Sequence, residues 1–412
     1  MFTKIENGVC ASKGFLANGV HCGIRKNKSK KDLAIIYSQV PCSAAAVYTQ
    51  NKVKGAPIAV TREHLTNGTA QAVIVNSGNA NTCNLNGEVI AEQMCQLCAD
   101  ALNLKAEDII VASTGVIGQP LPIEPIAEHV DELAKGLNEN GSDDAANAIM
   151  TTDTHKKEYA ISFELDGKEC RVGGIAKGSG MIHPNMATML CFITSDVKIA
   201  PALLKDLIKE VADDTFNMIS VDGDTSTNDM LSILCNGEAG NTEITEKNES
   251  YELFKAAVFE VCKTLSKMLA GDGEGATKLL TCKVTGGRSK KDAKAVAKSI
   301  ICSALFKSAM FGNDANWGRI LCAIGYADAE YEVDKIDVTL ASKKGSLLVC
   351  ENGRGAGCET SETGIDEEKA LEILKESEVE ILVDLKDGDY EATAWGCDLT
   401  YDYVKINGDY RT

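Results

Sequence analysis

The sequence predicts a mixed α/β (α+β) protein, because two kinds of segment occur along it. Short runs rich in β-branched residues predict strands at 70–76, 108–114, 159–165 and 379–385. Longer segments repeat apolar residues every three or four positions, which predicts helices at 202–218, 252–269 and 289–304. Ser289 is the expected N-cap of the last helix. At about 150 residues per domain, the 412 residues give two or three structural units.

Composition and charge exclude several classes of protein. The chain has 42 Lys and Arg against 60 Asp and Glu, a formal net charge of −18, with 44% hydrophobic and 25% charged residues. This composition allows a substantial buried core, whereas nucleic acids and anionic membranes bind clustered Lys and Arg. No apolar run approaches the roughly 18–20 residues that span a bilayer. We therefore expect a soluble cytoplasmic protein whose partners are neither nucleic acids nor membranes.

The 16 cysteines do not have the pattern of a disulfide framework. They are spread over the chain, and several lie in apolar segments where cysteine acts as a small hydrophobic residue: Cys191, Cys235, Cys262, Cys302 and Cys350. The one C-x-x-C motif, Cys95 and Cys98, lies in a predicted helix. A zinc site needs a second such pair or two histidines at ligand spacing, and the sequence has neither. No metal site is expected.

Several familiar motifs fail on their chemistry. The segment 222–228, DGDTSTN, resembles the start of a calcium loop, but Thr227 replaces the required glycine and Ile233 the bidentate glutamate. The glycine-rich segment 271–275 follows a predicted helix, whereas a dinucleotide-binding loop follows a strand. The sequence has neither a P-loop nor a G-x-S-x-G elbow. None of its five histidines has a triad or metal partner at a suitable spacing.

The segment 177–196, KGSGMIHPNMATMLCFITSD, is the candidate for catalysis. A loop rich in glycine leads to Ala187-Thr188, and a strand-like run follows at once. A hydroxyl at this junction indicates an N-terminal nucleophile: Thr188 would attack the carbonyl of Ala187, and an N→O acyl shift would cut the chain. The new α-amine, with a pKa of about 7.7–8.0, would act as the base. On this signal alone, a threonine that merely opens a strand is the commoner case.

The same segment resembles the self-cleavage signature of the ornithine acetyltransferase family, the bifunctional enzymes of arginine biosynthesis. The resemblance covers essentially the whole chain, with further segments in the expected order at 76–81 (NSGNAN), 113–118 (STGVIG), 150–153 (MTTD), 271–278 (GDGEGATK), 311–319 (FGNDANWGR) and 403–412 (YVKINGDYRT). The many cysteines depart from the family, but they lie outside these motifs.

The resemblance implies a fold and a division of the chain. The fold would be an N-terminal-nucleophile-like αββα sandwich of the ornithine acetyltransferase/DmpA type, with a C-terminal α/β unit. Cleavage would give an α chain, 1–187, and a β chain, 188–412. The core would continue to about residue 285, and the turn-rich segment 284–292 would lead into the C-terminal unit. The usual assembly of the family is a heterotetramer of two α and two β chains.

Residue roles also follow from the resemblance. Thr188 would be the nucleophile, and the Thr114 hydroxyl and Gly115 N–H would form the oxyanion hole. The implied substrate-binding residues are Thr151, Lys177, Thr188, Glu274, Asn407 and Thr412. Lys177 suits a substrate carboxylate and Glu274 an ammonium group. Thr152 stays an alternative to Thr151, one residue along.

The implied reaction is acetyl transfer in two half-reactions at one site. Thr188 would take the acetyl group from N2-acetylornithine, release ornithine, and pass the group to glutamate, giving N-acetylglutamate. In bifunctional members of the family, acetyl-CoA is a second donor. No metal or organic cofactor is implied.

Two other functions remain open on the sequence. An N-terminal-nucleophile aminopeptidase or amidase would resolve the same acyl-Thr188 ester with water. A metabolite-binding protein without catalytic activity would keep one uncut chain, in which Thr188 only opens a strand.

Overall fold

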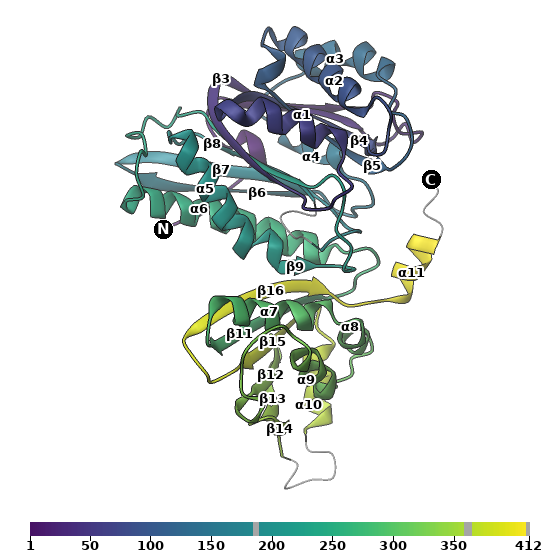
Figure 1. Cartoon of the computed structure of the whole chain (residues 1–412), viewed down its shortest axis with the longest axis vertical. Helices are drawn as coiled ribbons and strands as arrows, with labels where there is room; N and C mark the ends of the chain where they lie inside the picture. The colour runs from purple at the N-terminus through teal and green to yellow at the C-terminus, as the bar shows by residue number, and fades with distance from the viewer. Residues whose placement is uncertain (184–188, 358–364, 409–412) are drawn as a thin grey trace. The chain divides into compact units, whose positions relative to one another are not determined.

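The computed structural model describes residues 1–183, 189–357 and 365–408 (Figure 1). The chain forms two compact units. The first comprises Met1–Gly178, Pro184–Asn217 and Thr225–Leu265, and the second Ser179–His183, Met218–Asp224 and Ser266–Thr412. Both units contain strands and helices, so the mixed α/β class is confirmed.

The first unit is built on a nine-stranded sheet. Its strands are β1 Thr3–Ile5, β2 Phe15–Val20, β3 Leu33–Tyr48, β4 Thr69–Asn79, β5 Ile109–Val116, β6 Lys157–Leu165, β7 Lys168–Lys177, β8 Leu190–Ser195 and β10 Met230–Cys235. Its helices are α1 Ala56–His64, α2 Gly87–Leu102, α3 Glu124–Lys135, α4 Ser142–Ile149, α5 Pro201–Asp214 and α6 Glu249–Gly271, which ends in the second unit.

The long strand β3 divides this sheet into two halves. Its register with β4 shifts between Tyr37 and Cys42. Before the shift β3 pairs with β2 and β4. After it, Cys42 and Ser43 still pair with β4, and Ser43 to Tyr48 pair with β10. One half therefore contains β2, β4 and β5, and the other contains β1, β6, β7, β8 and β10.

The two halves share one core and have helices outside them. Ile36 and Val73 of the first half lie in one buried cluster with Phe192 of the second. Ile35 and Ile74 face the opposite way, into a cluster with α2 and α3, because successive strand side chains point to opposite faces. Figure 1 shows α5 and α6 covering the outer side of the other half. The layers are α, β, β, α, as the family resemblance implied.

The second unit has a seven-stranded sheet in the order β14-β13-β12-β15-β11-β16-β9. Its strands are β9 Ile219–Ser220, β11 Leu279–Gly287, β12 Asp337–Ser342, β13 Gly345–Glu351, β14 Arg354–Gly355, β15 Glu378–Asp384 and β16 Tyr390–Cys397. Its helices are α7 Lys290–Cys302, α8 Ala304–Phe311, α9 Trp317–Gly325, α10 Glu367–Leu374 and α11 Tyr401–Gly408. The helix α7 packs on β11 and β16.

Most of the predicted elements are confirmed. The four predicted strands correspond to β4, β5, β6 and β15, and the predicted helices to α5, α6 and α7. Ser289 caps α7 by accepting a hydrogen bond from the N–H of Asp292 at 3.1 Å. The helix α5 ends earlier than predicted, at Asp214, because Thr215 leaves the helical conformation (φ −125°, ψ −89°).

The segment 284–292 lies inside the second unit, where it joins the end of β11 to the start of α7. After two short earlier segments, the chain enters this unit for the last time at Ser266, within α6. β11 belongs to this unit because it pairs with β15 and β16, which come from the last part of the chain. The division into chains 1–187 and 188–412 concerns cleavage and stays a prediction.

In the part of the chain that the structure describes, no helix is both long and apolar enough to cross a membrane. Every cysteine in that part is a free thiol. Cys95 and Cys98 are buried in α2, and burial raises the pKa of the Cys98 thiol to about 12. The described residues contain no group of three or more His, Cys, Asp or Glu side chains that could hold a metal ion.

Candidate active site

The predicted oxyanion residues lie where two parallel strands of the first unit end. Thr114 of β5 pairs in register with Ser77 of β4, and Gly115 with Gly78. Gly115 has a φ of +134°, and a Cβ at this position would lie 2.3 Å from the carbonyl carbon of Gly78. Glycine is therefore required at position 115, because any side chain would force the two strand ends apart.

Lys177, the last residue of β7, contacts this turn. Its Nζ donates a hydrogen bond to Thr114 Oγ1 at 3.2 Å. An ammonium group can only donate, so the threonine oxygen is the acceptor in this contact. The hydroxyl proton of Thr114 thus remains available to a second acceptor, as the oxyanion role requires.

Lys177 lies in a buried cluster of charged groups. Its side chain is buried, and this burial lowers the pKa of its ammonium group. The carboxylates of Asp153 and Asp229 act in the opposite direction, and the cations Lys157 and Arg25 lower the pKa further. The ammonium group is thus held in a dry environment where an anionic ligand would bind strongly.

Asp153 organises this cluster. Its Oδ1 accepts hydrogen bonds from Lys157 Nζ at 2.6 Å and from the N–H of Gly178 at 2.7 Å. Its Oδ2 accepts one from the N–H of Thr151 at 2.8 Å, which fixes this predicted substrate ligand. Burial alone would raise the pKa of Asp153, but Lys157 and Lys177 and the hydrogen bonds lower it below its ordinary value. The sequence assigned Asp153 no role, although it ends the MTTD motif.

A buried amide joins the strand ends to β10. Asn228 Nδ2 donates to the carbonyl oxygens of Ala80 at 2.5 Å and Ser113 at 2.9 Å, and its Oδ1 accepts from the Thr82 hydroxyl at 2.7 Å. These bonds hold the residues that flank the oxyanion turn. The sequence shows the polar residues of the segment 222–228, but their pattern was interpreted only as an incomplete calcium loop.

Asp229 is a second buried carboxyl group near Lys177. Burial raises its pKa well above the ordinary value, against the effects of a hydrogen bond from Ser226 and the charge of Lys177. Its Oδ2 has no hydrogen-bond partner among the described residues. The sequence did not indicate Asp229 either.

The cleavage positions Ala187 and Thr188 lie outside the described residues, so the structure gives only their neighbours. The strand predicted after them is confirmed as β8, which starts at Leu190. In the sheet, Leu190 pairs with Lys177 of β7 on one side and with Met230 of β10 on the other. The start of β8 is therefore next to the strand end that contains Lys177.

In the second unit, two predicted substrate ligands contact each other. Asn407 of α11 donates a hydrogen bond from Nδ2 to Glu274 Oε2 at 2.7 Å. Glu274 is buried, its N–H donates to the carbonyl of Ser179 at 3.1 Å, and a Cβ on Gly180 would lie 2.4 Å from its carboxyl carbon. The loop after β7 thus packs directly on this carboxylate. Thr412, the last predicted ligand, lies outside the described residues.

Asp222 holds the same loop within the second unit. Its carboxylate accepts hydrogen bonds from the N–H groups of Met181 at 2.6 Å and Ile182 at 2.9 Å. Burial raises the pKa of the Tyr403 hydroxyl, and Asp222 raises it further. Asp222 is therefore an anchor for the backbone that leads to the predicted cleavage site. The segment resembled the start of a calcium loop, a match rejected on the sequence, because both functions use carboxylates near glycine turns.

Comparisons with known proteins agree with the predicted family. The model of the ArgJ family matches residues 16–412. The arginine biosynthesis bifunctional protein ArgJ of Caldanaerobacter subterraneus subsp. tengcongensis is 49% identical over 401 residues, which cover 97% of each chain. The protein of the same name from Thermotoga neapolitana is 46% identical, covering 97% of this chain and 99% of its own.

Two solved structures are also similar. The arginine biosynthesis bifunctional protein ArgJ of Bacillus halodurans is 40% identical and covers 53% of this chain and 97% of its own, with a TM-score of 0.48. The ornithine acetyltransferase of Mycobacterium tuberculosis in complex with ornithine is 37% identical and covers 45% of this chain and 100% of its own, with a TM-score of 0.43. From the family match and the identities over nearly its whole length, the chain belongs to the ArgJ family, the acetyltransferase enzymes of arginine biosynthesis.

Proposed function

We propose that this chain is a self-cleaving acetyltransferase that transfers an acetyl group from N2-acetylornithine to glutamate, with acetyl-CoA as a second donor. Cleavage between Ala187 and Thr188 makes Thr188 the N-terminal nucleophile. Beyond family membership, the main support is the hydrogen bond from Lys177 to Thr114. This bond joins the oxyanion turn to the strand that pairs with the start of β8.

In the first half-reaction, the Thr188 hydroxyl attacks the acetyl carbonyl of N2-acetylornithine, and the α-amine of Thr188 takes its proton. The negative charge that develops on the carbonyl oxygen is stabilised by the Thr114 hydroxyl and the Gly115 N–H. Each such donor contributes about 10²–10³-fold to the rate. The tetrahedral intermediate expels ornithine, which receives the proton, and leaves an acetyl-Thr188 ester.

In the second half-reaction, the amine of glutamate attacks this ester. N-acetylglutamate leaves, and Thr188 regains its hydroxyl proton. One site serves both halves because donor and acceptor share the amino-acid backbone. We assign the substrate carboxylate to Lys177, whose ammonium group is buried among charges, and an ammonium group of the substrate to Glu274, which Asn407 orients. Thr151 and Thr412 complete the proposed set of ligands.

The two fragments are proposed to stay together as a heterotetramer of two α and two β chains. The sheet of the first unit supports the association of one α with one β chain, because β8 of the β chain pairs with β7 of the α chain along six residues. Separation of the fragments would expose both strand edges. The cytoplasmic location stays a prediction from the sequence.

The mass of the purified protein tests self-cleavage. We expect two fragments, 1–187 and 188–412, and no cleavage or acetyl transfer in Thr188→Ala, because the attacking oxygen is absent. Thr188→Ser keeps a hydroxyl and an α-amine and should retain part of both activities. A full-length chain that transfers acetyl groups would refute self-cleavage, and normal cleavage of Thr188→Ala would place the cut elsewhere.

A transfer assay tests the chemistry. With N2-acetylornithine as donor, we expect ornithine and N-acetylglutamate to form together over many turnovers when glutamate is present. Without glutamate, ornithine release should stop at about one equivalent per site, because the acetyl-Thr188 ester has no acceptor. Replacing the donor by acetyl-CoA shows whether the enzyme uses both. Release of acetate at the same rate without glutamate would instead identify an amidase.

A further inference from the structure

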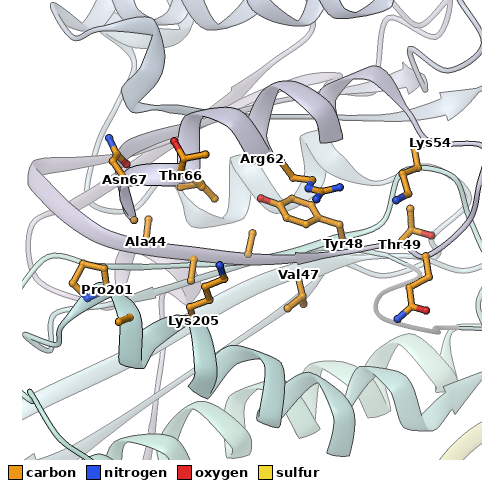
Figure 2. A pocket seen from close by; sticks show the side chains of 16 residues that line it. Ala44, Val47, Tyr48, Thr49, Lys54, Arg62, Thr66, Asn67, Pro201 and Lys205 are labelled. Carbon is orange, nitrogen blue, oxygen red and sulfur yellow. The ribbon is translucent and has the colours of Figure 1, made fainter.

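A groove of about 940 Å³ lies in the first unit, and none of the residues assigned above lines it (Figure 2). Its floor is the second half of β3, from Ala44 to Tyr48. Among the described strands, Ala45 to Tyr48 pair only with β10, so the other backbone edge of β3 is open toward the groove there. At Ala44 this edge is occupied, because the Ala44 N–H donates to the carbonyl of Gly68 at 2.8 Å. The helices α1 and α5 form the two sides.

Three cations line this groove: Lys54, Arg62 and Lys205. No acidic side chain lines it, and none of the three cations has an ion-pair partner within the described ranges. The chain as a whole has a net charge of −18, so three unpaired cations around one concave surface are a local exception. Such a surface attracts anions.

The floor of the groove adds an apolar surface and a hydrogen-bond donor. Figure 2 shows Tyr48 on β3, with Arg62 on the α1 side and Lys205 on the α5 side. Burial raises the pKa of the Tyr48 hydroxyl, against the charge of Arg62, so this group keeps its proton at neutral pH. Ala44, Ala45 and Val47 are buried, so the apolar surface of the floor comes from the half-buried side chains of Ala46 and Tyr48.

The helix α5 begins at the end of the groove. Pro201 occupies its first turn, and the N-cap residue, Ala200, has no side chain that could accept from the first N–H groups. These free donors and the positive end of the helix dipole also favour an anion. Of the three cations, Lys205 belongs to this helix, whereas Arg62 lies on the α1 side and Lys54 at the other end of the groove.

We infer that this groove binds a nucleotide, with its phosphate groups on the cations and its base on the floor formed by β3. A purely apolar ligand would leave the cations unpaired, and inorganic phosphate alone would leave the half-buried Ala46 and Tyr48 uncovered. Arg62 can bind a phosphate through two parallel hydrogen bonds. The volume lies within the range of about 300–1,000 Å³ that is typical of ligand sites.

This nucleotide could be free, or it could be the nucleotide end of coenzyme A. Tyr48 pairs with Met230 of β10, which pairs with Leu190 of β8. With strands about 4.8 Å apart, the Tyr48 end of the groove lies roughly 10 Å from the start of β8. The pantetheine arm of a CoA held here could cover that distance. The CoA form of the inference rests on the proposed function, whereas nucleotide binding itself does not.

Calorimetric titration of the cleaved protein with ADP, CoA and inorganic phosphate tests the inference. The variants are Arg62→Gln and Lys205→Gln, and the matched control is Lys209→Gln, an exposed lysine on the same helix outside the groove. We expect ADP to bind, with an affinity that falls at least about tenfold in both groove variants, since charged hydrogen bonds contribute about 1.5–3 kcal/mol. In the control, the affinity should change less than about twofold.

Each outcome decides one part of the inference. Two results together identify CoA as the source. CoA binds more tightly than ADP, and Lys205→Gln raises the KM for acetyl-CoA but not the KM for N2-acetylornithine. Equal affinities identify a free nucleotide. Three results would each overturn the inference. These are no binding of ADP or CoA at millimolar concentration, a loss of ADP affinity in Lys209→Gln equal to that in the groove variants, and phosphate binding as tight as that of ADP. Binding needs no turnover, so failure of the proposed acetyl transfer would leave this test valid.

Discussion

The candidate residues of the first unit are held differently from those of the second. Lys177 and Asp153 are buried at strand ends, and several hydrogen bonds fix them. Glu274 lies in the turn after α6 and Asn407 in the short helix α11, and one hydrogen bond joins their side chains. A change in the first group should therefore affect folding or the chemical step, whereas a change in the second should affect mainly substrate affinity.

The largest effect on stability is expected for Asp153→Asn. This change leaves Lys157 and Lys177 buried without their carboxylate partner, so the free energy of unfolding should fall by about 3–5 kcal/mol. Urea denaturation measures this value. The control Asp143→Asn breaks the exposed pair with Lys156 and should cost no more than about 1 kcal/mol. Equal losses in the free energy of unfolding of Asp153→Asn and Asp143→Asn would show that the buried cluster stabilises the fold no more than an exposed ion pair does.

The pH dependence of stability follows from the same carboxyl group. The folded state lowers the pKa of Asp153, so its contribution is present above the ordinary aspartate pKa of about 3.9 and is lost as the pH falls toward the folded value. The difference in stability between the wild type and Asp153→Asn should therefore shrink in acid.

Thr114→Ala tests the chemical step. Its hydroxyl is needed in the tetrahedral transition state, so kcat should fall by about 10²–10³-fold, or roughly 2.7–4 kcal/mol, while KM stays within a few-fold. Activity must be normalised to the cleaved fraction, because the same donor can assist self-cleavage. Thr114→Ser keeps the hydroxyl and should recover most of kcat. A Thr114→Ala enzyme with normal kcat and lower thermal stability would show that Thr114 only closes a turn.

The sequence predicted the elements better than the contacts. The strands β4, β5 and β6 are local runs of β-branched residues, and Thr114, Lys177, Glu274 and Asn407 were indicated by family motifs. Local pattern could not give the end of α5 or the three separate segments that make up the second unit. Both depend on backbone conformation and on pairing with distant strands.

The missed residues act over long sequence separations. Asn228 bonds to Ala80 and Ser113, 148 and 115 residues away. Asp229 and Asp153 both act on Lys177, which ends β7, whereas the two aspartates lie in separate loops. An isolated sequence shows the hydrogen-bonding capacity of such side chains but not their partners, because sheet order places the partners together. For the same reason, no pattern in the sequence predicted the groove over β3.

In the second unit, Glu274→Gln should weaken the binding of the ammonium-bearing substrate. Its amide keeps the size of the side chain and can still accept from Asn407, but it has no charge. We expect KM for N2-acetylornithine to rise by about ten- to a hundredfold, which corresponds to the roughly 1.5–3 kcal/mol of a charged hydrogen bond, with little loss of stability. Glu368→Gln, an exposed change in the same unit, is the charge control. A fall in kcat alone would assign Glu274 to the chemical step.

The smallest effect is expected for Asn407→Ala. Asn407 donates to Glu274 Oε2 at 2.7 Å and is exposed near the end of α11. Its loss removes one orienting hydrogen bond while the charge of Glu274 remains, so KM for N2-acetylornithine should rise by about three- to tenfold at an unchanged kcat. Lys405→Ala, on the same exposed helix, is the control for a change in helix stability. In the double variant with Glu274→Gln, the effect of Asn407→Ala should nearly vanish, because residues that act through one contact are not additive. Full additivity would mean that Asn407 binds the substrate independently of Glu274.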